Sequence, residues 1–298
     1  MLRHRGDVAP NGRRTGRTPA SMDPVSRSAA AAALRSHLLV SGLAGTVATT
    51  REKSLTRYRL FAARDPRALL GLEPERDWSV PELIALMAAE CGVSADPGRL
   101  TGQDTIDPDR TVAALDAFAV RLAVAAERRA PVLLGTGHPD RLLGFYAALA
   151  AALSAAGCPV LAPAEGCRVD ITTRFGVRPY NLSYVGGVAL VAEPGARPAH
   201  GAPGAHTHSP LPLRTALAAA AAGPGPVPEL VIGDHGWVCA AGQLGVEAMG
   251  PGDADDPALY VGRAEGRVSV VVPLDDAAPP DSYGPLARYV LDHSGLSP

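Results

Sequence analysis

The sequence predicts an α/β fold: a doubly wound, mostly parallel sheet preceded by a helical N-terminal segment. From Ala130 onward, short apolar runs alternate with helix-like stretches, whereas residues 26–128 contain mainly helical patterns. Such alternation is typical of a parallel sheet with helices on both faces. The 298 residues are 47% hydrophobic, which is enough for a substantial core. We expect a disordered extension over 1–25, a helical segment over 26–129 packed on the core, and a Rossmann-like domain over 130–298.

The first 20 residues carry five arginines and little apolar material. They lack the apolar segment of a secretion signal, and they offer too little apolar surface to offset the entropy of ordering. We therefore expect this extension to be disordered, with Met22 as a candidate start.

The helical segment contains four predicted helices. Ser79 and Glu82 have the spacing of a capping box, which marks the start of one of them. Asp107 or Asp109 is expected to cap another, although Asp107-Pro-Asp-Arg-Thr also fits the pattern of haloacid-dehalogenase-like phosphatases. The residues before Asp107 are polar, which is atypical of the buried strand that those enzymes require. The predicted helices are Ala29–Leu39, Ser54–Ala63, the stretch from Ser79 to Glu90, and Thr111–Arg129.

The C-terminal segment contains seven predicted strands and five predicted helices. The strands are Pro131–Leu134, Pro159–Ala162, Arg168–Thr172, Val185–Ala192, Leu230–Ile232, Val246–Met249 and Val268–Val272. The helices are Pro139–Ala156, Leu211–Ala222, Gly236–Leu244, Pro257–Glu265 and Tyr283–Leu291. Glu193–Gly204 is rich in proline, glycine and alanine, which predicts a loop.

Composition excludes several classes of partner. The net charge of -2 gives no basic field for nucleic acid, and aromatic residues make up only 4%. No apolar run is long enough to span a membrane. The four cysteines form no Cys-x-x-Cys pair, which favours free thiols in a reducing cytoplasm. We therefore expect a cytoplasmic protein that acts on a small molecule; the oligomeric state is not predicted.

Four of the eight histidines lie in motifs that point to a site at one edge of the sheet. Gly135-Thr-Gly-His-Pro, which contains His138, joins a predicted strand to a predicted helix. Ligands of open α/β sheets bind beyond the carboxyl ends of the strands. The backbone of Gly135, Thr136 and Gly137 is a candidate phosphate site at a helix start; the alternative is a tight turn with Thr136 as cap.

Gly233-Asp-His-Gly occupies the same position after another predicted strand. The carboxylate of Asp234 is a candidate metal ligand, water activator or ribose contact, or it only caps the helix. His235 and His138 are candidate general acids or bases. We expect Asp234, His235 and His138 to share one cleft.

His206-Thr-His-Ser places two imidazoles on alternate residues, which project the same way from an extended segment. His206 and His208 are thus candidate ligands of one ion or one phosphate, unless the segment is an exposed loop. The motif resembles the first metal motif of the polymerase-and-histidinol-phosphatase hydrolases. It lacks the apolar strand near the N-terminus that precedes the motif in that family.

Two further segments are candidate substrate contacts. Arg51 and Ser54 belong to a basic cluster with Lys53, Arg57 and Arg59, which is a phosphate site or a solvated face. Asp170, Thr172 and Arg174 end another strand and form a candidate third wall. Asp253-Ala-Asp-Asp-Pro is expected to be a loop and helix cap rather than a pair of ligands.

Several motifs together resemble an actinobacterial family of phosphatases. They are Leu134-Gly-Thr-Gly-His-Pro, Val169-Asp-Ile-Thr-Thr-Arg-Phe-Gly, His206-Thr-His-Ser-Pro and Val231-Ile-Gly-Asp-His-Gly-Trp, together with Thr50-Arg-Glu-Lys-Ser-Leu and Leu60-Phe-Ala-Ala-Arg-Asp-Pro-Arg. The resemblance extends from about Ser26 to the C-terminus and implies hydrolysis of phosphomonoesters. It supplies no catalytic residues, and the sequence contains no Walker loop, Gly-x-Ser-x-Gly elbow or Cys-x5-Arg loop.

The favoured function is therefore hydrolysis of a small phosphomonoester, assisted by a divalent ion such as Mg, Mn or Zn. Asp234, with His206 and His208, is the predicted metal-binding set. Two alternatives stay open: a non-catalytic protein that binds a nucleotide or sugar phosphate, and a sugar-phosphate isomerase or lyase. Bound metal at Asp234 would favour the enzyme, whereas a cleft formed only by loop amides and arginines would favour the binding protein.

Overall fold

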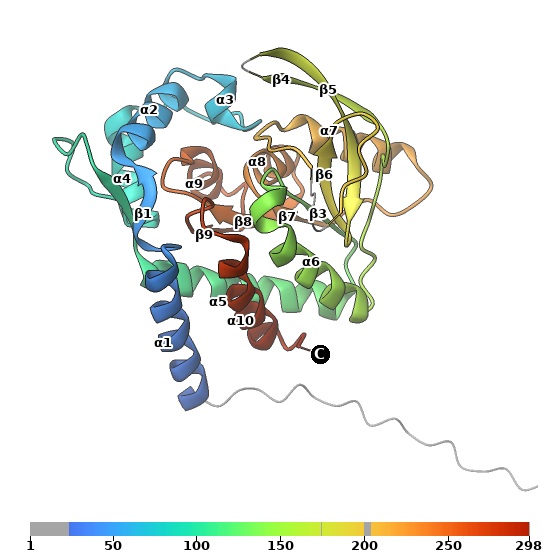
Figure 1. Ribbon diagram of the computed structural model, residues 1–298, viewed down its shortest axis with the longest axis horizontal. Coiled ribbons are helices and arrows are strands. Elements are labelled where there is room, and N and C mark those ends of the chain that lie inside the picture. Colours follow the sequence, from blue (N-terminus) through green and yellow to red (C-terminus); the bar gives the residue numbers. More distant parts are fainter. Residues whose placement is uncertain (1–23, 174, 200–203, 298) are drawn as a thin grey trace, which may run out of the picture.

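The computed structural model describes residues 24–173, 175–199 and 204–297 (Figure 1). A seven-stranded sheet with the order β4-β5-β6-β3-β7-β8-β9 forms its centre. β6, β3, β7, β8 and β9 are parallel, whereas β4 and β5 pair antiparallel. The predicted α/β fold with a mostly parallel sheet is therefore confirmed. The strands are β3 (Val132–Gly135), β4 (Arg168–Thr173), β5 (Gly176–Val185), β6 (Val188–Ala192), β7 (Leu230–Gly233), β8 (Glu247–Gly252) and β9 (Val270–Pro273).

Helices cover both faces of the sheet. α5, α6 and α10 contact one another or the strands on one side, and α7, α8 and α9 form the other layer (Figure 1). Both layers are needed because strands such as β3 and β7 are buried along their whole length. The helices of this half are α6 (Pro139–Ala155), α7 (Leu211–Ala222), α8 (His235–Gln243), α9 (Pro257–Ala264) and α10 (Gly284–Ser294), with a 3₁₀ turn, η1 (Pro280–Tyr283), before α10.

The N-terminal half wraps around this sheet. Its elements are α1 (Pro24–Ser41), α2 (Arg51–Ala62), α3 (Pro66–Leu69), α4 (Val80–Glu90), α5 (Pro108–Arg128) and a two-stranded antiparallel sheet of β1 (Gly45–Thr50) and β2 (Gln103–Ile106). Ser79 and Glu82 form the predicted capping box, and the side chain of Asp107 caps α5. One buried hydrophobic cluster includes residues of both halves. Within this shared core, α5 of the N-terminal half packs on β9. The division of the chain at residue 129 stays a prediction.

Three local expectations differ from the structure. Pro159–Ala162 forms only a single bridge, between Val160 and Val132, because Pro159 has no N–H group to donate to a ladder. The predicted strand Val185–Ala192 is interrupted at Gly186 and Gly187, whose positive φ angles of 58° and 80° turn the chain from β5 into β6. β1, β2 and β5 are not predicted, because β1 and β2 are rich in threonine and other polar residues and only two of the ten positions of β5 are buried.

Two expectations fall partly on residues that the structure does not describe. The predicted N-terminal extension includes residues 1–23, which lie outside the described ranges. The predicted loop Glu193–Gly204 includes residues 200–203, which also lie outside them. Within the described ranges, no helix combines the length and the apolar composition that crossing a bilayer requires.

Candidate active site

The candidate site lies at the carboxyl edge of the five parallel strands. Each of these strands is followed by polar side chains that reach the same region. They are His206 and His208 after β6, His138 after β3, Asp234 and His235 after β7, Asp253, Asp255 and Asp256 after β8, and Asp275 and Asp276 after β9. Carboxyl ends of parallel strands meet at one edge, so residues far apart in sequence are brought together.

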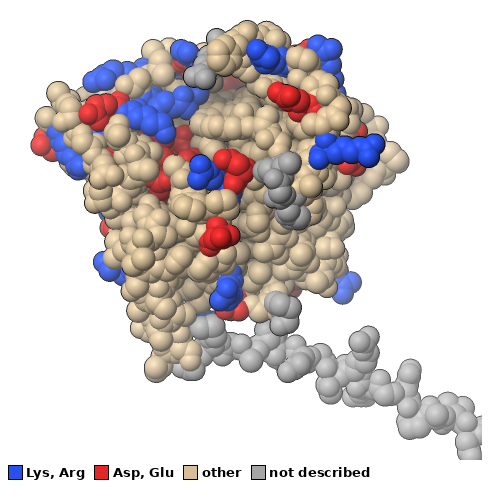
Figure 2. All heavy atoms as spheres, in the orientation of Figure 1, with Lys and Arg blue, Asp and Glu red and all other residues tan. Residues whose placement is uncertain are grey.

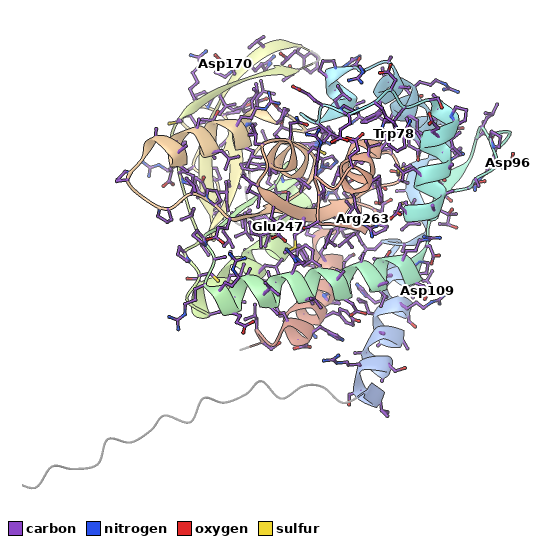
Figure 3. All side chains as sticks on the ribbon, turned by 180° about the vertical axis from the view of Figure 1, so that it is seen from behind. Trp78, Asp96, Asp109, Asp170, Glu247 and Arg263 are labelled. Atoms are coloured by element: carbon purple, nitrogen blue, oxygen red, sulfur yellow. The ribbon has the colours of Figure 1, made fainter. Side chains whose placement is uncertain are left out.

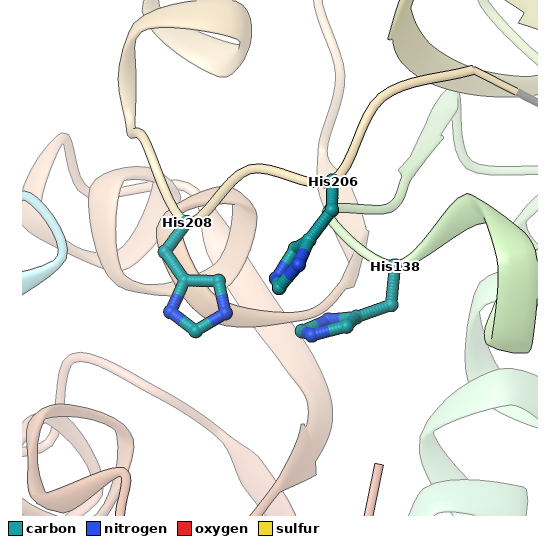
Figure 4. Close-up of side chains that lie close together, drawn as sticks. All are labelled: His138, His206 and His208. Atoms are coloured by element: carbon teal, nitrogen blue, oxygen red, sulfur yellow. The ribbon is translucent and has the colours of Figure 1, made fainter. Parts of the chain in front are cut away.

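Four imidazole rings form the centre of the site. The ring centroid of His138 lies 4.1 Å from that of His206 and 5.1 Å from that of His208, while His206 and His208 are 4.8 Å apart (Figure 4). His235 lies 4.6 Å from His138 and stacks on His208 at 3.9 Å. Ligand nitrogens of His138, His206 and His208 all lie within 4.8 Å of one another, so these three side chains can hold a single metal ion.

Glycines allow the segment with His206 and His208 to lie against the strand ends. The amide of Thr207 donates a hydrogen bond of 2.9 Å to the carbonyl oxygen of Gly137. A Cβ atom on Gly137 would lie 2.0 Å from the carbonyl oxygen of Thr207, and one on Gly236 would lie 2.6 Å from that of His208. Both distances are too short for any side chain, so these glycines are required for the approach.

Asp234 connects the loops after β3 and β7. Its carboxylate accepts hydrogen bonds from the amide of Gly137 at 2.6 Å and from the hydroxyl of Thr136 at 2.7 Å. The same hydroxyl accepts a bond from the amide of His138. Asp234 makes no side-chain cap on α8, so the helix-cap interpretation is wrong. Its oxygens lie 3.7 Å from Nδ1 of His235 and 4.0 Å from Nδ1 of His138, which suits a carboxylate that positions both rings.

The loop after β3 offers no free amide to a phosphate. The amides of Thr136, Gly137 and His138 already donate to Ala189, Asp234 and Thr136. Gly135 faces Trp237, because a Cβ atom at Gly135 would lie 2.3 Å from that ring. The structure therefore supports a different role from the predicted phosphate cradle: Gly135, Thr136 and Gly137 fix the position of His138.

His235 occupies a strained position between carboxylates. Its φ of 44° lies in the left-handed region, which non-glycine residues rarely adopt, and its side chain is 2% exposed. Nε2 of His235 lies 2.9 Å from Asp256 and 3.3 Å from Asp276. The strand-to-helix turn after β7 thus aims this ring at the ends of β8 and β9.

The acidic residues after β8 and β9 are the part of the site that sequence analysis missed. Asp253 accepts a hydrogen bond from the hydroxyl of Thr49 at 2.5 Å, and Asp256 makes no side-chain cap on α9. The loop-and-cap interpretation of this segment is therefore wrong for the side chain of Asp256. Both segments directly follow apolar strands, so the rule that singled out His138 and His235 could have found them.

Two residues of α2 reach these carboxylates. Nζ of Lys53 lies 3.1 Å from Asp255, and Arg57 lies 3.9 Å from the same carboxylate. The guanidinium of Arg57 also lies 3.5 Å from Nδ1 of His208. The N-terminal half therefore contributes cations directly to the site.

The predicted contacts Arg51 and Ser54 have other partners. The buried guanidinium of Arg51 donates to the carbonyl oxygens of Ser94 and Arg99 and lies 3.5 Å from Asp104. The hydroxyl of Ser54 donates to the carbonyl oxygen of Thr50. The structure does not place either side chain with the histidines.

A large cleft opens beside His206 and His208. Its volume is about 1220 Å³, and its walls come from α2–α3, from β4–β5 and from the start of α7. Arg57, Arg67 and Arg214 line it, and Figure 2 shows the molecule hollowed there, with basic side chains on the α2 side. Thr172 also lines the cleft, and its role as part of a third wall of the site stays a prediction. Asp170 is exposed on the edge strand β4 and pairs with Arg168 (Figure 3), and Arg174 lies outside the described residues.

Burial and neighbouring charges set the protonation of the rings. Burial and the neighbouring His138 lower the pKa of His206 to about 4, and burial with the charge of His235 lowers the pKa of His208 well below its usual value. Burial opposes the charged form of His235, but Asp256, Asp234 and Asp276 outweigh it and raise its pKa. Burial and the neighbouring Asp255 raise the pKa of Asp253. At neutral pH, His206 and His208 are therefore neutral, the form that binds metal.

Comparison with known proteins adds two findings. A family model described as Phosphatase matches residues 29–298. Phosphatase SCO2771 from Streptomyces coelicolor is 41% identical to this chain over 275 residues, which are 92% of this chain and 99% of that protein.

Proposed function

This chain belongs to the Phosphatase family, which confirms the resemblance drawn from its motifs, and we propose that it hydrolyses a small phosphomonoester with the help of a divalent metal ion. The observation that carries the proposal is the set of His138, His206 and His208, whose ligand nitrogens converge beside a cleft lined by arginines. Family membership supplies the reaction class, and the geometry supplies the place where it would occur.

The side chains present fit a metal ion. His138 Nδ1 and His208 Nε2 are buried and have no hydrogen-bond partner in the described part of the chain. Buried polar atoms without partners are costly, so such atoms at a functional site indicate a missing ligand. Three imidazoles are a donor set suited to zinc and other divalent transition metals. When bound, the ion supplies Lewis-acid polarisation of the phosphoryl oxygens.

The remaining site residues bind the substrate and hold the ligands in place. His206 and His208 line the cleft, so a phosphate group that enters the cleft would contact the histidine set through these two side chains. Arg57 lies in the same wall, 3.5 Å from His208, where its guanidinium can bind two phosphoryl oxygens and offset charge in the transition state. Asp234 is a positioning residue, since both of its oxygens hold the loop that carries His138.

The converging imidazoles favour an enzyme over a non-catalytic binding protein. A binding protein would hold phosphate through loop amides, but the amides of the loop after β3 already have partners within the protein. Nothing in the described residues specifically favours an isomerase or lyase.

The test is phosphate release by the purified chain from a panel of phosphorylated metabolites, after chelation and after return of Mg²⁺, Mn²⁺ or Zn²⁺. We expect release only with metal. His206→Ala should lower kcat/KM by more than about 100-fold, because even an outer-shell partner of a metal contributes roughly 10–100-fold. His293→Ala is the matched control, since His293 contacts Tyr289 on α10 and lies outside the cluster. Full activity of the chelated protein, or equal activity of the two variants, would contradict the proposal.

A further inference from the structure

We propose that this site holds a second divalent ion, bound by His235, Asp276 and His138, so that the centre is dinuclear. The inference rests on the proposed function, because it adds an ion beside the one held by His138, His206 and His208. The two ligand sets meet at His138, whose ring would lose its N–H proton to solvent and bind one ion through each nitrogen as an imidazolate. The other two members of the second set, His235 and Asp276, belong to no other ligand set and follow β7 and β9.

The distances in the second set match those between ligands of one ion. Nε2 of His235 lies 3.3 Å from Oδ2 of Asp276, and Nε2 of His138 lies 3.8 Å from the same oxygen. Two ligand atoms that are each about 2.1 Å from an ion are roughly 3.0 Å apart at a right angle and roughly 3.4 Å apart at a tetrahedral angle. At a wider angle the separation reaches about 4.2 Å. Both observed distances fall in this range.

Unpartnered buried atoms point into the same space. Within the described ranges, both ring nitrogens of His235 and Oδ1 of Asp256 have no hydrogen-bond partner, although these side chains are only 2% and 1% exposed. Nε2 of His235 lies 2.9 Å from Asp256, but the two groups do not have hydrogen-bond geometry. Because leaving such groups unsatisfied is costly, a ligand is expected there.

The local charge favours a cation. Asp253 and Asp275 accept hydrogen bonds from Thr49 and from backbone amides, and Asp255 pairs with Lys53. Asp256 accepts one hydrogen bond of 3.3 Å from the amide of Asp253, and Asp256 and Asp276 share Nε2 of His235 as a neighbour; within the described residues, no lysine or arginine lies at ion-pair distance from either carboxylate. Two carboxylates that share a single imidazole keep a net negative charge even when that ring is protonated, and one divalent ion would balance both charges.

The two ligand sets differ in chemistry. The first consists of imidazoles alone, whereas the second includes the carboxylate of Asp276, with that of Asp256 close by. Carboxylate oxygens favour harder ions, so the second site should prefer Mn²⁺ or Mg²⁺ more than the first does.

The test measures bound Mn²⁺ in the full-length chain after chelation and dialysis against excess Mn²⁺. We expect two equivalents for the unmodified protein, one for Asp276→Asn and two for Asp140→Asn. Asp140 is a suitable control because it is an exposed carboxylate near His138 that pairs with Arg141. Electron paramagnetic resonance of the loaded, unmodified protein should show a spin-coupled Mn²⁺ pair, which does not depend on whether a variant folds.

The possible outcomes separate this inference from the proposed function. One equivalent in the unmodified protein, lost in His206→Ala and retained in Asp276→Asn, would overturn the second ion and leave the first in place. Two equivalents retained in Asp276→Asn would also overturn it. So would an electron paramagnetic resonance spectrum of the Mn²⁺-saturated, unmodified protein that shows only isolated Mn²⁺ ions. No bound Mn²⁺ in any variant would overturn both proposals.

Discussion

Asp234 illustrates how a single carboxylate organises the site. From the sequence it is a metal ligand, a water activator or a helix cap. In the structure its two oxygens accept hydrogen bonds from Thr136 and Gly137. The rings of His138 and His235 lie 4.0 and 3.7 Å from the same carboxylate. Its role is thus to hold the loops from β3 and β7 together and to face the imidazoles with a negative charge.

We predict that Asp234→Asn folds but loses function. An asparagine can still accept from Gly137 and can donate to the hydroxyl of Thr136, so the loops should stay in place. The charge that supports His138 and His235 would be lost. Metal affinity and kcat/KM should each fall by roughly 10–100-fold, the usual effect of losing an outer-shell carboxylate. Calorimetric metal titration and thermal melting, with Asp140→Asn as the control, check this. Unchanged metal affinity in Asp234→Asn would remove Asp234 from the site.

At the scale of elements, the site depends on how closely the segment with His206 and His208 approaches β3 and α8. The hydrogen bond from Thr207 to Gly137 fixes this approach, and Gly137 and Gly236 leave room for it. The sequence alone does not show which segment approaches Gly137 or Gly236, because the atoms for which these glycines leave room belong to segments distant in the sequence.

We predict that Gly137→Ala disrupts the histidine cluster more than it disrupts the fold. The added methyl would lie 2.0 Å from the carbonyl oxygen of Thr207, so the segment with His206 and His208 must move away from His138. Gly144→Ala is the matched control, since Gly144 lies in α6 and a Cβ there meets nothing within 4 Å. Gly144→Ala should be neutral or stabilise α6 by about 0.5–1 kcal/mol. Equal metal affinity in the two variants would contradict this account of Gly137.

The elements that could be predicted are those whose pattern is local. Val132–Gly135 and Leu230–Gly233 are short, wholly apolar and followed by helix starts, and both are strands as expected. β5 was missed because only two of its ten positions are buried; its pairing with β4 and β6 stabilises a strand that its composition does not predict. Pro159–Ala162 was overpredicted because apolar character alone does not show whether a neighbour can pair.

For the whole molecule, the sequence predicted the architecture but only part of the candidate site. The four histidines could be proposed because each lies in a loop motif with recognisable chemistry. Asp256 and Asp276 also follow apolar strands and could have been proposed by the same rule, but only the strand order, with β8 and β9 next to β7, shows that they reach His235. Lys53 and Arg57 join the site only because α2 packs over the same edge, a contact between the two halves of the chain.

We propose that the histidine cluster binds metal at the place where substrate phosphate enters the cleft. An anomalous difference map from crystals of the full-length chain grown with Mn²⁺ and inorganic phosphate tests it most directly. The strongest peak should lie among His138, His206 and His208, with phosphate density on the cleft side beside Arg57. Metal peaks confined to surface carboxylates such as Asp170, or phosphate bound away from the histidines, would contradict it.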